Sequence, residues 1–160
     1  MPKIKDTDAE RMDPGHDVSA DLKTLEAEIL GYLKGGYNGA AFPELLEVVE
    51  RSGETTRGGV ALYLADDLVA WSGVSEQFAR AMSDLIERGR VHFHALTSEL
   101  EAFIVHSAHG EALSLPMVTD RRPSTGYKSP HWVPVVVYSG SGCGAANCLG
   151  KDVRSRKPKR

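Results

Sequence analysis

The spacing of apolar residues along this chain changes at Gly89, and this change constrains the fold more than any other feature of the sequence. Before Gly89, apolar residues recur every three or four positions, which is the period of an amphipathic helix. After it, the stretch "RVHFHAL" (residues 90–96) alternates apolar and polar residues as a β-strand does. Helices followed by a strand-forming C-terminal part predict an α+β fold.

Five segments are predicted to be helices. Ser19 or Asp21 can cap the first, Pro43 suits the first turn of the second, and Gly53 can end that second helix. Ser75 can cap the fourth. The predicted helices cover residues 19–34, 43–52, 60–71, 75–88 and 98–108.

Two apolar, β-branched runs follow, at residues 111–120 and 131–139, and they predict the arms of a β-hairpin with residues 121–130 as its long tip. The chain has 160 residues, which suits one domain with tails. We therefore expect a flexible N-terminal segment, a folded domain, and a flexible glycine-rich and basic tail, covering residues 1–18, 19–138 and 139–160 respectively.

The segment at 75–88 has one apolar stripe, made by Phe78, Met82, Leu85 and Ile86, and a polar opposite face. With the predicted helix 60–71 and the turn Gly73-Val74-Ser75, it would form two helices joined by a short turn. The stretch "LADDLVAWSGVSEQFARAMSDLIERGRV" (residues 64–91) resembles the helix-turn-helix of winged-helix transcription regulators.

This resemblance implies a winged-helix-like domain whose small antiparallel sheet forms a hairpin wing. It also implies a sequence-specific transcriptional regulator that binds double-stranded DNA as a homodimer and catalyses no reaction. In that family the second helix reads base edges, and the basic wing contacts phosphates. The residues expected to contact DNA are therefore Ser75, Glu76, Gln77, Arg80 and Ser83 on the helix, Arg121, Arg122, Tyr127 and Lys128 in the wing, and Arg154, Arg156 and Lys157 in the tail.

The distribution of charge leaves a second function open. The net charge is −3, and the last ten residues contribute +5, which leaves −8 on residues 1–150. A basic tail suits contact with a polyanion, whereas Glu76 and Asp84 on the polar helix face would repel phosphates. The alternative is a small winged-helix-like protein-interaction module, such as a phage- or plasmid-type effector that binds a host protein.

Other chemistries find little support in the sequence. His92 and His94 would share one face of a strand, and Cys143 and Cys148 could add ligands for zinc. However, C-x₄-C is not a usual zinc spacing and the histidines come from different predicted elements, so we expect no metal and no cofactor. No apolar run is long enough to span a membrane and no secretory signal begins the chain, which predicts a cytoplasmic protein.

Overall fold

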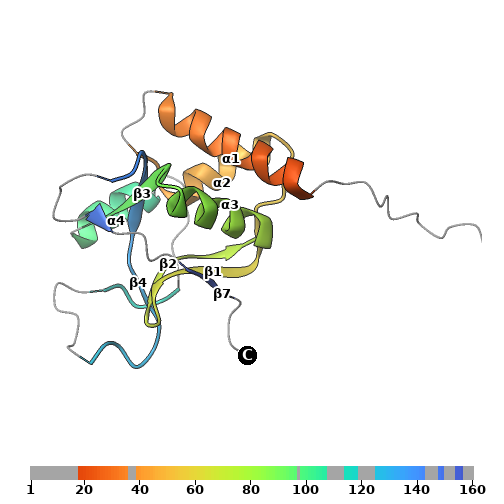
Figure 1. Ribbon diagram of the computed structural model, residues 1–160. Helices are drawn as coiled ribbons and strands as arrows, with labels where there is room; N and C mark the ends of the chain where they lie inside the picture. The colour runs from red at the N-terminus through yellow and green to blue at the C-terminus, as the bar shows by residue number, and fades with distance from the viewer. Residues whose placement is uncertain are drawn as a thin grey trace, which may run out of the picture.

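The computed structural model describes residues 18–35, 39–96, 98–107, 114–118, 125–142, 148–149 and 154–156. These residues form an α+β fold, as the sequence predicted (Figure 1). Within them, no helix is long and apolar enough to cross a membrane. The elements are α1 (Val18–Lys34), α2 (Phe42–Arg51), β1 (Arg57–Ala65), β2 (Leu68–Val74), α3 (Glu76–Glu87), β3 (Val91–Ala95), α4 (Glu99–Ser107), β4 (His131–Trp132), β5 (Val135–Ser139), β6 (Cys148–Leu149) and β7 (Arg154–Arg156).

Four of the five predicted helices are confirmed, as is the strand after Gly89. Helices α1, α2, α3 and α4 match the predicted segments to within one residue at each end, and β3 lies inside the predicted strand. Ser75 caps α3, because its Oγ accepts a hydrogen bond from the backbone N–H of Phe78 at 3.1 Å. Boundary residues and apolar spacing therefore suffice to locate these elements.

The predicted helix over residues 60–71 is wrong, because this segment belongs to the antiparallel hairpin β1–β2. The hairpin turns at Asp66 and Asp67. The strand-forming residues on either side explain the outcome, since Val60, Val69 and Trp71 are buried against the core. Apolar residues on both arms of a tight hairpin also fall at helical spacing, so periodicity alone does not separate the two structures.

The strands form two sheets. One has the order β4–β2–β1–β7, in which β4 runs parallel to β2 and the other neighbours are antiparallel. The other has the order β5–β3–β6, with both pairings antiparallel. An isolated bridge between Ala40 and Val137 adds the segment before α2 to the outer side of β5. Helix α3 lies between α1 and the β1–β2 hairpin and contacts both (Figure 1).

The C-terminal part differs from the prediction in two ways. The expected hairpin between residues 111–120 and 131–139 does not form: among the described residues the two runs share a parallel bridge between Met117 and Trp132, and β5 pairs with β3 instead. The segment expected to be a flexible tail supplies β6 and β7. Both differences arise because pairing partners far apart in sequence leave no periodic signal along the chain.

Phe42, the first residue of α2, lies at the centre of the core. Its ring stacks on Trp71 of β2 with centroids 6.1 Å apart. It also forms edge-to-face pairs with Phe78 of α3 and Phe93 of β3, with ring centroids 6.4 Å and 5.5 Å apart. All four rings are buried, so one aromatic cluster connects α2, α3 and both sheets.

Candidate functional site

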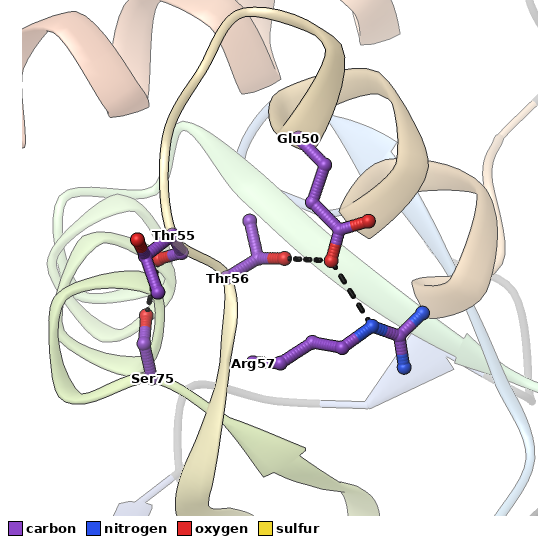
Figure 2. Close-up of polar contacts among 5 residues, drawn as sticks. All are labelled: Glu50, Thr55, Thr56, Arg57 and Ser75. Atoms are coloured by element: carbon purple, nitrogen blue, oxygen red, sulfur yellow. Dashed lines mark hydrogen bonds and ion pairs between the residues drawn. The ribbon is translucent and has the colours of Figure 1, made fainter.

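At the base of the β1–β2 hairpin, hydrogen bonds connect the end of α2 to the start of α3 through Thr55 and Thr56 (Figure 2). The N–H of Ser75, just before α3, donates to the carbonyl of Thr56 at 2.7 Å, and the Ser75 hydroxyl donates to the carbonyl of Thr55 at 2.9 Å. The buried Thr56 hydroxyl donates to Glu50 of α2 at 2.6 Å. We call Thr55, Thr56 and Ser75 the hairpin base. It makes α2 and α3 a connected helix pair, with the hairpin inserted in the connection.

The polar face of α3 is the surface that the sequence singled out. We call Glu76, Gln77, Arg80, Ser83, Asp84 and Glu87 the α3 surface. Glu76, Arg80 and Glu87 are exposed, and the other three residues are half-buried. On one side the α3 surface borders a groove against α1, where Arg88 forms an ion pair with Glu26. The groove is lined by Leu22, Lys23, Glu26, Arg80, Asp84, Glu87 and Arg88.

The charge of the groove is mixed, because its lining contains three cationic and three anionic side chains. Strand β7 contacts α3 and pairs with the middle of β1, opposite Ala61, Leu62 and Tyr63. The pairing therefore brings Arg154 and Arg156, more than sixty positions along the chain from α3, to the flank of that helix.

Two of the predicted helix contacts are engaged within the fold. The Ser75 hydroxyl both caps α3 and bonds to the hairpin base. The Ser83 hydroxyl donates to the carbonyl of Ala79 in the preceding turn, at 2.8 Å. Arg80 is the exposed cation near the middle of α3, and Gln77 lies one turn before it. The side chains best placed to meet a ligand are therefore Gln77, Arg80 and the neighbouring acids.

Of the predicted wing residues, the structure describes Tyr127 and Lys128, and it does not bring these two together with α3. The backbone N–H of Tyr127 donates to a carboxylate oxygen of Asp67 at 2.7 Å, and the Tyr127 ring stacks on His131 with centroids 3.6 Å apart. These contacts hold Tyr127 and the exposed Lys128 at the turn of the β1–β2 hairpin. That turn is roughly 25 Å from the hairpin base, because eight residue steps of about 3.3 Å each separate Asp67 from Ser75 along β2. Arg121, Arg122 and Lys157 lie outside the described residues.

A second group of polar side chains lies on the outer face of the three-stranded sheet. His92 and His94 alternate with buried residues on β3, and Cys148 of β6 is the direct partner of His94 in the strand pairing. We call His92, His94 and Cys148 the histidine cluster; all three are half-buried. The Nε2 atoms of the two histidines are 3.1 Å apart. Tyr138 of β5 packs over both rings, at centroid distances of 5.7 Å from His92 and 4.4 Å from His94.

The surroundings of the histidine cluster favour the neutral form of His94. Burial, and secondly the neighbouring His92 ring, lower the pKa of His94. Spacing along the chain revealed that His92 and His94 share a face. It could not reveal Cys148, because only the pairing of β3 with β6 brings that residue opposite His94.

No protein-family model, curated protein or solved structure matches this chain. A function is therefore to be sought in the chain's own contacts, of which the α2–α3 pair and the histidine cluster are the two most specific.

Proposed function

We propose that this protein is a winged-helix-like, sequence-specific DNA-binding protein, acting as a transcriptional regulator by occupying its site and without catalysis. The observation that carries the proposal is the hairpin base. Its hydrogen bonds connect the end of α2 to the start of α3 through Thr55 and Thr56. This connection supports the assignment of α3 as the recognition helix and of α2 as the helix before it. The first helix of the motif is thus α2, not residues 60–71.

The order of the remaining elements supports this assignment. In a winged helix, the recognition helix is followed by antiparallel strands packed beside the helices. Here α3 ends at Arg88, the chain turns at Gly89 with φ +65°, and β3 follows and pairs with β5. Compared with that arrangement, the chain carries two insertions: the β1–β2 hairpin within the helix pair, and the α4-containing connection between β3 and β5.

The chemistry of the α3 surface suits base recognition. Arg and Gln make paired hydrogen bonds to guanine and adenine edges in the major groove, and Arg80 and Gln77 lie one turn apart on the outward side of α3. Arg154 and Arg156 would supply the phosphate contacts that fix the helix in register. One such module buries a small surface on DNA, so we expect a homodimer that binds two half-sites.

The acids of the α3 surface favour a different partner. Glu76, Asp84 and Glu87 would repel phosphates, and a basic protein surface would instead pair with them. This is the protein-interaction module that the charge distribution of the sequence left open.

Selection of duplexes from a random pool by the purified full chain tests the proposal. We expect a recurring sequence to be enriched, and an affinity for it that falls steeply with salt. The double variant Arg154→Gln/Arg156→Gln should lower the magnitude of the slope of log K against log salt by up to about 1.8, from roughly 0.9 for each phosphate contact. The control is Lys34→Gln, which removes an exposed cation at the end of α1, outside the α3 surface and the groove, and should leave the slope unchanged. Failure to enrich any duplex, with no binding at low salt, would reject DNA binding in favour of a protein partner.

A further inference from the structure

The histidine cluster has the composition and geometry of a metal site. We propose that His92, His94 and Cys148 bind a divalent transition-metal ion of the zinc class. Their ligand atoms all lie within 4.8 Å of one another. In a tetrahedral zinc site, bond lengths of about 2.0–2.1 Å to nitrogen and 2.3 Å to sulfur place two nitrogens about 3.3 Å apart and nitrogen and sulfur about 3.6 Å apart. The two Nε2 atoms, 3.1 Å apart, already approach that spacing.

The hydrogen bonding of His92 fixes which of its nitrogens can bind an ion. Its Nδ1 lies 3.0 Å from the carbonyl oxygen of Gly140, which can only accept. In the neutral ring the proton is therefore on Nδ1, and Nε2 presents a lone pair toward His94. Donation of the second ring N–H to a backbone carbonyl is the usual support of a metal-bound histidine, because it orients the ring and makes the ligating nitrogen more basic.

The glycine-rich turn after β5 encloses the cluster. Gly140 and Gly142 adopt φ values of +101° and +121°, which bring the chain back over the sheet. Gly140 accepts the bond from His92, and a Cβ placed on Gly142 would lie 3.7 Å from the sulfur of Cys148. The turn therefore reaches both a histidine and the thiol. This gives residues 140–142, "GSG", a role that their sequence alone did not indicate.

The types of ligand decide the class of ion. Two imidazoles and a thiolate suit zinc, cobalt or copper, whereas magnesium and calcium require oxygen ligands. Three protein ligands leave one tetrahedral position for water or an added ligand. An ion there would tie β6, a strand of two residues, to β3 by a bond between side chains.

Titration of the full chain with Co²⁺ under reducing conditions tests the site. We expect visible bands of tetrahedral cobalt and a near-ultraviolet band from thiolate-to-cobalt charge transfer, both lost on adding Zn²⁺. Zinc affinity is then measured by competition with a chromophoric chelator. Cys148→Ser should abolish the charge-transfer band, and His94→Asn should weaken zinc binding by at least about 100-fold, since even outer-shell partners contribute 10- to 100-fold.

The matched control is His131→Asn, which removes a histidine from β4 in the other sheet and should bind zinc like the unaltered chain. Thermal unfolding with and without zinc accompanies each variant. The unaltered chain and His131→Asn should gain stability that a chelator removes, whereas Cys148→Ser and His94→Asn should not. Two outcomes would overturn the proposal: an unaltered chain that shows no charge-transfer band at excess cobalt, or a Cys148→Ser variant that keeps it. If Cys148→Ser does not fold, the unaltered chain still decides the question: an unfolding temperature that does not change on adding zinc would reject the site.

Discussion

Gly39 is the position where one added carbon should be felt most sharply. It precedes the bridge between Ala40 and Val137 and has φ +88°. A Cβ placed there would lie 2.4 Å from Cγ1 of Val136 and 2.8 Å from the ring of Tyr138. Both neighbours are side-chain atoms of β5, so either Val136 and Tyr138 must rotate or the backbone at Gly39 must shift. Gly39→Ala therefore combines backbone strain with overpacking.

The backbone strain and the overpacking each lower the free energy of unfolding. An alanine held at positive φ costs roughly 1–2 kcal/mol relative to glycine. Carbon atoms pack at about 3.5–4.0 Å, so Val136 or the chain would have to move by an ångström or more, and overpacking of this kind costs about 1–3 kcal/mol. Gly39→Ala should destabilise the protein by about 2–5 kcal/mol in total.

Gly53→Ala is the matched control, because Gly53 has φ +90° and its added Cβ would meet no atom within 4 Å. Gly53→Ala should lower the free energy of unfolding only through the strain of an alanine at positive φ, by about 1–2 kcal/mol. Urea unfolding of both variants measures the difference between their losses of stability. The midpoints are compared with the slope m, the dependence of the unfolding free energy on urea, held constant. Equal losses for the two variants would refute the close approach of Gly39 to β5.

Three further predictions concern the α2–α3 pair. Thr56→Val should cost about 1–3 kcal/mol in urea unfolding because it removes the bond to Glu50 from a buried site; an unchanged midpoint would mean that this bond is not needed. Ser75→Ala loses the cap of α3 and the bond to Thr55, so the free energy of unfolding should fall by about 1–2 kcal/mol. DNA affinity per folded molecule should stay constant. A large change in affinity without a loss of stability would contradict the structural role of Ser75. Glu87→Gln removes a repulsive charge from the α3 surface and should tighten DNA binding about twofold at low salt, an effect that should vanish at high salt; weaker binding would mean that this acid contacts the partner.

Local signals in the sequence suffice for most of the helices. Pro43 and Ser75 locate helix starts, and the apolar stripe of α3 gives its buried face. The same kind of signal failed at residues 60–71, where Leu62, Val69 and Trp71 fit either a helix or two paired strands. The two aspartates at the centre of that segment were the sign of a turn, and they lie at the tip of the hairpin.

Contacts between distant segments were beyond sequence reasoning. Nothing local to Arg154 predicts that it pairs with Tyr63, and nothing local to Cys148 predicts that it faces His94. Strand pairing is decided by which edges remain available after the core has formed, and that depends on the whole chain. The sequence therefore indicated α3 as a functional surface and named His92, His94 and Cys148 as possible zinc ligands. That β7 lies next to α3, and that Cys148 lies close to the two histidines, emerged only with the fold.

The measurement that most directly tests recognition by α3 is a fluorescence-anisotropy titration of one selected duplex and a scrambled duplex with three proteins: the unaltered chain, Arg80→Ala and Lys34→Ala. Both variants lose one exposed cation, but only Arg80 lies on the α3 surface. The account predicts that Arg80→Ala loses about 1–3 kcal/mol on the selected duplex and much less on the scrambled one, while Lys34→Ala binds both like the unaltered chain. Equal binding of the selected duplex by all three proteins would contradict it.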